Sequence, residues 1–202
     1  NTLAILLLLT APAYAGGAMG LMMAAGSSVA TALACNTTTP YLSQTSFDSS
    51  YTVWETTTRE IFGQSSYTPA ADIRVCRLDF YIFSNAGTPP SDYVARIYSM
   101  NGASLGTNPT GTCTSTAQAI TGTGFHASSQ FTGLDCTLSS AGSYGIVLTR
   151  TGASVDAVNY VTAGSSAGDA SISGFGVRFQ ANGTVGASVT PKDTTFKIYR
   201  LE

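Results

Sequence analysis

The residues of this chain that could perform chemistry are few and widely spaced. Its only histidine is His126, so a Ser-His-acid triad would have to be built on that residue. No Gly-x-Ser-x-Gly elbow stands near an expected strand-to-helix turn, where such a nucleophile would be presented. Six aspartates could act as the paired carboxylates of a glycoside hydrolase only if they converge in space: Asp72, Asp79, Asp92, Asp135, Asp156 and Asp169. We therefore expect a protein that is not an enzyme and that uses no cofactor.

The four cysteines do not form a metal-binding pattern. Cys35, Cys76, Cys113 and Cys136 have neither the CxxC nor the Cys/His spacing of structural zinc, and the chain has no DxDxDG calcium loop. An even number of cysteines in a Thr/Ser-rich, Lys-poor chain is compatible with disulfides in an oxidising compartment, and equally with four buried thiols. If disulfides form, we favour the pair Cys113 and Cys136, across a hairpin.

Aromatic side chains are the candidates for ligand binding, because they can stack on sugar rings when they are exposed. The residues concerned are Tyr51, Trp54, Tyr67, Tyr81, Tyr98, Tyr160 and Tyr199. The alternative is that the tyrosines are half-buried residues of a sheet. Trp54 lies at the expected junction of an N-terminal arm and the body of the protein, and we expect it to hold the arm against the body.

The charge composition excludes one class of partner. Charged residues make up 10% of the chain, against roughly 25% in ordinary soluble domains. The net charge is −2, and no lysine precedes Lys192. Because no basic stripe is available to neutralise phosphates, we do not expect a nucleic-acid partner.

The N-terminal segment is apolar, and residues 1–47 contain no charged side chain. Residues 3–15 resemble a signal peptide, but neither an initiator Met nor a basic n-region is present, so we expect the segment to be retained. Interrupting Pro12 and glycines, without flanking Lys or Arg, argue against a membrane span. We expect residues 1–50 to be an assembly arm buried between subunits, with a core helix of the same chain as the alternative. Its candidate contact residues are Leu3, Leu6, Leu9, Met19, Met22 and Met23.

From Tyr51 onward the pattern changes to short β-type runs separated by Gly, Pro, Asn and Ser clusters. Asn101-Gly102 is a strong hairpin dipeptide. No stretch after residue 50 has the apolar spacing of a helix. The expected strands are 73–83, 93–98, 112–119, 125–131, 134–138, 144–149, 158–161, 176–180 and 195–199.

The clearest expected strand is 73–83. By the two-residue period, one face is a core face, and the opposite face, which includes Arg77 and Asp79, is mixed. The core face consists of Cys76, Leu78, Phe80 and Ile82, and the mixed face also contains Val75, Tyr81 and Phe83.

The order of these runs resembles the jelly-roll modules of phage virion structural proteins and of bacterial surface-anchored proteins. The resemblance covers residues 59–201 and lies in the stretches 73–78, 93–98 with 105–107, 142–148 and 195–199. It implies an all-β fold, a jelly-roll-like antiparallel β-sandwich over residues 51–202.

Two functions follow as expectations. The first is a non-enzymatic structural subunit of an extracellular assembly, such as a phage capsid-decoration, fibre or tail protein at the virion surface. Its partners would be identical subunits or other virion or filament proteins. The second is a secreted or cell-surface adhesion module or filament subunit that binds a glycan through exposed aromatic side chains.

Overall fold

The computed structural model describes residues 32–53, 61–102, 104–151, 158–167, 175–179, 185–188 and 192–202. The chain divides into two units, residues 1–32 and residues 33–202, and the second unit is called the body below. The body thus begins earlier than the expected residue 51, because residues 42–53 pair with strands from later in the chain. The expected assembly residues Leu3, Leu6, Leu9, Met19, Met22 and Met23, and the junction residue Trp54, lie outside the described residues.

The described part of the body is built almost entirely of strands. They are β1 (Leu42–Gln44), β2 (Ser49–Val53), β3 (Ile61–Tyr67), β4 (Ile73–Phe80), β5 (Ile82–Asn85), β6 (Tyr93–Asn101), β7 (Ser104–Thr114), β8 (Gln130–Leu138), β9 (Tyr144–Arg150), β10 (Val161–Ala167), β11 (Phe175–Phe179), β12 (Val185–Ser188), β13 (Lys192–Thr194) and β14 (Phe196–Arg200). Among these residues the helical content is one 3-10 turn, Ala127–Ser129. A helix long and apolar enough to cross a membrane is not found in the described ranges.

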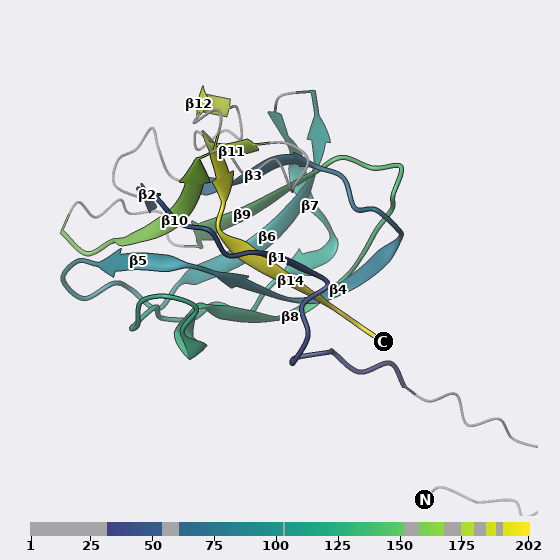
Figure 1. Cartoon of the computed structure of the whole chain (residues 1–202), viewed down its shortest axis with the longest axis horizontal. Helices are drawn as coiled ribbons and strands as arrows, with labels where there is room; N and C mark the ends of the chain where they lie inside the picture. Colours follow the sequence, from purple (N-terminus) through teal and green to yellow (C-terminus); the bar gives the residue numbers. More distant parts are fainter. Residues whose placement is uncertain are drawn as a thin grey trace, which may run out of the picture. The chain divides into compact units, whose positions relative to one another are not determined.

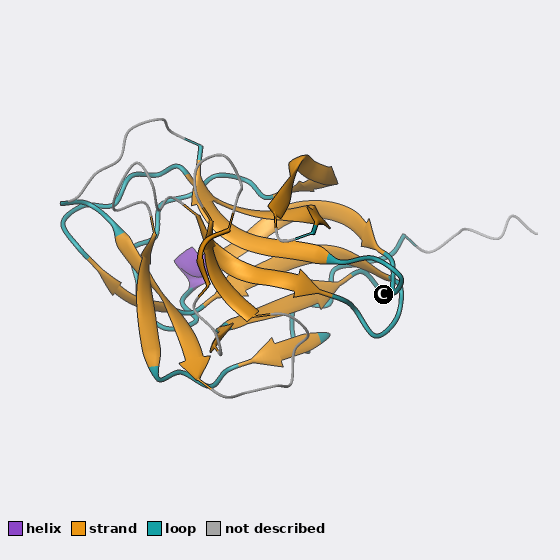
Figure 2. Cartoon of the chain, turned by 90° about the horizontal axis from the view of Figure 1, so that it is seen from above, coloured by secondary structure: helices purple, strands orange, loops and turns teal. Residues whose placement is uncertain are grey.

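The strands form two antiparallel sheets. The larger sheet has the order β1-β14-β4-β8-β7-β6-β9-β3-β11-β12, and the smaller has the order β13-β10-β2, with β5 also paired to β10. In Figure 1, β1 and β14 lie in front of β6 and β9, although all four belong to the larger sheet, so this sheet contributes to both layers of the sandwich. The turned view in Figure 2 shows the strands of the two layers crossing. The body is therefore an all-β antiparallel sandwich, which confirms the predicted fold class.

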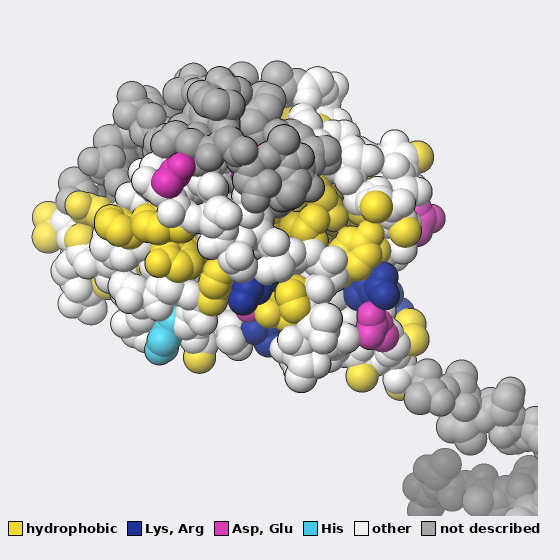
Figure 3. Space-filling view, in the orientation of Figure 1, with side chains coloured by type: hydrophobic (Ala, Val, Ile, Leu, Met, Phe, Trp, Pro, Cys, Tyr) yellow, Lys and Arg dark blue, Asp and Glu magenta, His cyan; other side chains and the backbone are white. Residues whose placement is uncertain are grey.

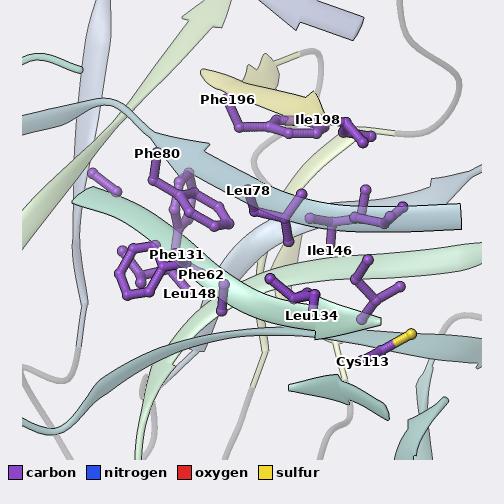
Figure 4. Close-up of a cluster of buried hydrophobic side chains, with 14 of the residues drawn as sticks. Phe62, Leu78, Phe80, Cys113, Phe131, Leu134, Ile146, Leu148, Phe196 and Ile198 are labelled. Atoms are coloured by element: carbon purple, nitrogen blue, oxygen red, sulfur yellow. The ribbon is translucent and has the colours of Figure 1, made fainter. Parts of the chain in front are cut away.

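The hydrophobic core lies between the two layers. Phe80 of β4 and Phe196 of β14 are fully buried on one side, and Ile146 and Leu148 of β9 are fully buried on the other. Phe80 stacks on Phe196 at 6.2 Å and meets Phe131 of β8 edge-on at 6.0 Å. Figure 4 shows these side chains converging from both layers. Each such side chain contributes about 1.5–3 kcal/mol through burial, so the core is the main source of stability.

Two strand pairs pass from one sheet to the other at a shared corner. Tyr81 separates β4 from β5, and Thr195 separates β13 from β14. The Tyr81 N–H donates to the Thr195 carbonyl at 3.0 Å. Gly164 of β10 is hydrogen-bonded to both of these residues. Its N–H donates to the Tyr81 carbonyl at 2.8 Å, and its carbonyl accepts from the Thr195 N–H at 3.0 Å. Bends of this kind let one strand serve two sheets.

The expected strand 73–83 is wrong in two respects. The chain bends at Tyr81, because the following residues pair with β10 rather than with β14. In addition, the β4–β8 register shifts between Val75 and Arg77, so Val75 and Leu78 both reach the core despite their odd spacing. The face expected to be mixed is also buried, since Arg77 and Asp79 are both shielded from solvent.

Three weaker strand predictions also need correction. Strand β7 ends at Thr114, earlier than the expected 119. The expected strand 125–131 is interrupted because the His126 side chain caps the 3-10 turn that follows it. The expected strand 158–161 is mostly a bend, in which Asn159 accepts a hydrogen bond from the Thr88 N–H at 2.7 Å, and β10 starts only at Val161. In the last two cases a side-chain hydrogen bond or a bend replaces the backbone pairing of a strand.

Candidate functional site

Two disulfides cross-link the larger sheet. Cys113 and Cys136 are joined, which confirms the predicted pair between β7 and β8. Cys35 and Cys76 are also joined, and this bond attaches the start of the body to β4. No cysteine is free. The alternative of four buried thiols is therefore wrong.

The start and the end of the body lie side by side at the end of β4 that carries Cys76. The Ala34 N–H donates to the Glu202 carbonyl at 3.0 Å, and the Glu202 N–H donates back to the Ala34 carbonyl at 2.9 Å. The Glu202 carboxylate accepts hydrogen bonds from the Asn36 amide at 2.9 Å and from Arg200 Nε at 3.0 Å. The Asn36 and Arg200 hydrogen bonds lower the pKa of Glu202. This end is held by a covalent bond, backbone pairing and charge together.

At the opposite end of β4, four aromatic side chains form a cluster that we call the aromatic corner: Phe47, Tyr81, Phe83 and Phe125. Phe47 stacks on Tyr81 at 4.9 Å and on Phe83 at 5.1 Å, and Tyr81 meets Phe125 edge-on at 5.5 Å. Phe83 is 48% exposed, and the other three rings are partly buried. Figure 3 shows hydrophobic side chains gathered on this face of the body, with Lys and Arg side chains beside them.

The backbone places these rings from three separate segments. Phe47 comes from the link between β1 and β2, which is held where the Asp48 N–H donates to the Ser165 carbonyl at 3.0 Å. Phe125 follows Gly124, which pairs with Ile82 through two backbone hydrogen bonds. The rings can approach β10 only because residue 164 is glycine. A Cβ there would lie 2.7 Å from Tyr81 and 2.9 Å from Phe47.

A cation borders the aromatic corner. The Lys197 ammonium lies 4.1 Å from the centroid of the Phe125 ring, a cation–π contact. Lys197 stands opposite Asp79 in the β14–β4 register. Both oxygens of Asp79, however, accept hydrogen bonds from Arg77, each at 2.6 Å. The one carboxylate across the strand from Lys197 is therefore already neutralised.

The Arg77–Asp79 pair is buried on the outer face of the sheet. The Arg77 guanidinium also lies 4.3 Å above the centroid of the Tyr199 ring. The Asp79 hydrogen bonds raise the pKa of Arg77, and burial raises the pKa of the Tyr199 hydroxyl, with the Asp79 charge acting in the same direction. The group is internally satisfied, so it supports the surface rather than offering charges to a ligand.

Three of the six tyrosines considered for sugar binding are not available at the surface. Tyr67, Tyr98 and Tyr199 are buried, as the alternative interpretation held. Tyr81 and Tyr160 are partly exposed. Trp54 and the side chain of Tyr51 lie outside the described residues.

The catalytic candidates are engaged in local structure. His126 Nδ1 accepts from the Ser128 N–H at 3.1 Å and lies 2.9 Å from Ser128 Oγ. That oxygen also accepts from the N–H groups of Thr121 and Gly122, at 3.0 and 3.1 Å. Both of its lone pairs are therefore occupied, and the pair forms a turn cap. Gly164 to Gly168 reads Gly-x-Ser-x-Gly, but its first four residues lie within β10 and not at a strand-to-helix turn.

The described aspartates each contact a partner other than a carboxylate. Asp135 pairs with Arg74, and Asp92 pairs with Arg150. Asp72 accepts hydrogen bonds from the N–H and hydroxyl of Ser140, and Asp79 pairs with Arg77. Asp156 and Asp169 lie outside the described residues. Within the described ranges, no group of three or more His, Cys, Asp or Glu side chains could hold a metal ion.

Reasoning from the sequence missed Phe47, Phe83, Phe125 and Lys197. The two-residue period places Tyr81 and Phe83 on one face of the expected strand, but it does not show that Phe83 is exposed. The contribution of Phe47 and Phe125 could not have been foreseen, because both reach the corner through long-range pairing. The described body is an all-β sandwich with a partly exposed aromatic cluster at one end of β4. No family model, no curated protein and no solved structure matches this chain.

Proposed function

We propose that this protein is a non-enzymatic structural subunit of an extracellular assembly, a phage virion surface protein such as a capsid-decoration, fibre or tail component, attached through its N-terminal arm. Its partners are identical subunits or other virion or filament proteins.

The observation that carries the proposal is the contrast between the arm and the core of the body. The main described core cluster draws all its fully buried members from Val53 to Ile198. Residues 1–31, by contrast, carry no charged side chain in the sequence, and an apolar segment of that length needs a buried environment. Burial between subunits supplies one.

The attachment of the body's first residues supports the same role. The Cys35–Cys76 bond and the Ala34–Glu202 pairing fasten the residues that directly follow the arm to β4 and to the chain's last residues. A load applied to the arm would reach the sheet through a covalent bond. Two disulfides are also what an extracellular location favours.

The test compares the oligomeric state of the full chain with that of full-chain variants Leu6→Asp and Met22→Asp, measured by light scattering after size-exclusion chromatography. We expect both variants to be folded monomers, because a charge in a buried apolar contact is costly. The control is Ala70→Asp, at an exposed position of the body, which should assemble normally. Assembly of the arm variants at the wild-type size would refute the proposal.

A second candidate function, a secreted carbohydrate-binding adhesion module, is supported by the aromatic corner. Partly exposed rings on a rigid sheet suit sugar stacking. A broad glycan array probed with the full chain tests it, and the absence of any signal would count against it.

A further inference from the structure

We propose that the aromatic corner and Lys197 together bind an acidic polysaccharide, with one sugar ring against the exposed Phe83 ring and a carboxylate of the same polysaccharide on the Lys197 ammonium. The inference rests on the second candidate function and gives it a site and a ligand class. It is independent of the assembly role proposed for the arm.

The aromatic surface is held in place before any ligand arrives. Tyr81 is held by its backbone hydrogen bonds to Thr195 and Gly164, and Phe125 is held through the paired Gly124 and Ile82. Phe47 rests against both Tyr81 and Phe83. Because the rings support one another, a ligand need not order them, which lowers the entropic cost of binding.

The corner presents an open apolar surface. Phe83 is 48% exposed, whereas large apolar side chains in the same sheets are mostly buried. A contiguous apolar patch with a polar rim is the usual signature of a binding surface. The exposed Phe83 ring suits the C–H face of a pyranose, which is flat and apolar while its edges carry hydroxyls.

The charge next to the corner selects the class of sugar. Asp79, the carboxylate opposite Lys197, is occupied by Arg77 at 2.6 Å through both oxygens. The Lys197 ammonium lies on the Phe125 ring at 4.1 Å. A lysine ammonium that lies on an aromatic ring can still pair with an anion at the edge of that ring. The corner therefore combines sugar stacking with one positive charge, which matches a uronic or other acidic sugar.

The same charges argue against a nucleic acid as the ligand. One lysine replaces only one counterion, whereas binding a phosphate backbone relies on several cations. The chain's net charge of −2 gives no general attraction for polyanions. Recognition by one stacked ring and one carboxylate fits a short acidic segment of a polysaccharide.

The experiment uses the full chain and a galacturonic acid tetrasaccharide, with the carboxyl-reduced tetrasaccharide as the neutral counterpart. Isothermal titration calorimetry should show about tenfold tighter binding of the acidic form, the effect of one charge-assisted contact. A panel with mannuronate and sialylated oligosaccharides is titrated in parallel. The proposal is overturned if no acidic probe binds, or if the neutral form binds equally well.

Three variants separate the contributions. Lys197→Gln should lose about tenfold in affinity for the acidic probe and leave binding of the neutral form unchanged. Phe83→Ala should weaken both forms, because it removes the exposed ring. Val158→Ala is the control, since Val158 is 70% exposed but is not part of the corner, and it should bind as wild type does. Unchanged binding by Phe83→Ala would overturn the assignment.

Light scattering on the same variants distinguishes failure of the glycan-binding proposal from failure of the assembly proposal. We expect Phe83→Ala and Lys197→Gln to keep the wild-type oligomeric state. If Phe83→Ala instead changes the oligomeric state and leaves glycan binding intact, the corner is a contact between subunits and the glycan proposal is wrong.

Discussion

The two ends of strand β4 are held in different ways. At the end that carries Arg74 and Cys76, a disulfide to Cys35 and a bidentate ion pair between Arg74 and Asp135 tie the strand to its neighbours. At the other end the strand bends at Tyr81, and aromatic rings from three segments rest on one another. The first end uses covalent and ionic bonds, and the second uses packing.

The difference indicates where a ligand can bind. At the first end, the charged side chains pair with one another and the two cysteines are joined, so these groups offer little to a ligand. The packed rings leave Phe83 about half exposed, and Arg77 occupies both oxygens of Asp79, the carboxylate opposite Lys197, whose ammonium lies on the Phe125 ring. A strand that is fastened at one end can present a binding surface at the other without losing its place in the sheet.

We call the end of β4 near Cys76 the fastened end and the end near Tyr81 the packed end. The largest effect on the free energy of unfolding is expected from Asp79→Asn, at the packed end. The substitution leaves the Arg77 guanidinium buried without its carboxylate, which costs about 3–5 kcal/mol of the free energy of unfolding. Urea unfolding measures it. The control is the double variant Arg77→Met/Asp79→Asn, which buries no charge and should recover most of the loss. A cost below about 1 kcal/mol would mean that the pair is not buried as described.

The next largest effect is expected at the fastened end, from Cys35→Ala/Cys76→Ala. The bond closes a loop between residues 41 positions apart, and its loss should cost about 2–4 kcal/mol of the free energy of unfolding. Limited proteolysis with mass spectrometry should then find new cleavage between residues 36 and 41. Cys113→Ala/Cys136→Ala is the control, which should be destabilised without new cleavage in that stretch. Cleavage in both variants alike would remove the distinction between the two ends.

Local patterns in the sequence predicted much of the fold but little of the corner. The β-type run 144–149 and the Asn101-Gly102 dipeptide predicted a strand and a hairpin that the structure contains, and the predicted pair Cys113–Cys136 is also correct. These features depend on neighbouring residues or on one hairpin. The all-β sandwich follows from them, because period-two strands need a second layer to bury their apolar faces.

The remainder depended on contacts distant in sequence. The bend at Tyr81 is caused by pairing with Gly164, which no local pattern reveals. Arg77 and Asp79 were expected on a mixed face, and they can be buried only because their charges compensate each other. The sequence assigns no partner to Cys35. Its partner, Cys76, lies on β4, 41 residues further along the chain and after three other strands.

A smaller effect is expected from Gly164→Ala, which tests whether packing alone builds the corner. Replacing glycine by alanine would ordinarily stabilise by about 0.4–1 kcal/mol through the unfolded chain. Here the new Cβ would lie 2.7 Å from Tyr81, and overpacking costs about 1–3 kcal/mol, so the steric term should prevail.

Phe47→Leu in the same chain should relieve part of this cost, and a double-mutant cycle from urea unfolding measures the coupling. If the effects of Gly164→Ala and Phe47→Leu on the free energy of unfolding are additive, the Phe47 ring does not rest on β10.

The smallest effect is expected from Asp135→Asn, which removes the exposed ion pair at the fastened end. Exposed pairs contribute little to the free energy of unfolding, so the thermal midpoint at pH 7 should fall only slightly. The Arg74 hydrogen bond lowers the pKa of Asp135 in the folded protein. A lowered pKa stabilises the fold above the unfolded value of about 3.9 and loses that contribution as the pH falls.

Wild type and Asp135→Asn should therefore approach each other in thermal midpoint as the melts are repeated at successively lower pH, from about 3.9 down through the lowered pKa of Asp135. Asp79→Asn is the matched comparison, because it breaks a bidentate arginine pair on the same strand that is buried instead of exposed. If Asp135→Asn destabilised the protein as much as Asp79→Asn, burial would not be what separates the two ends of β4. The fastened end would then depend on its ion pair as strongly as the packed end does.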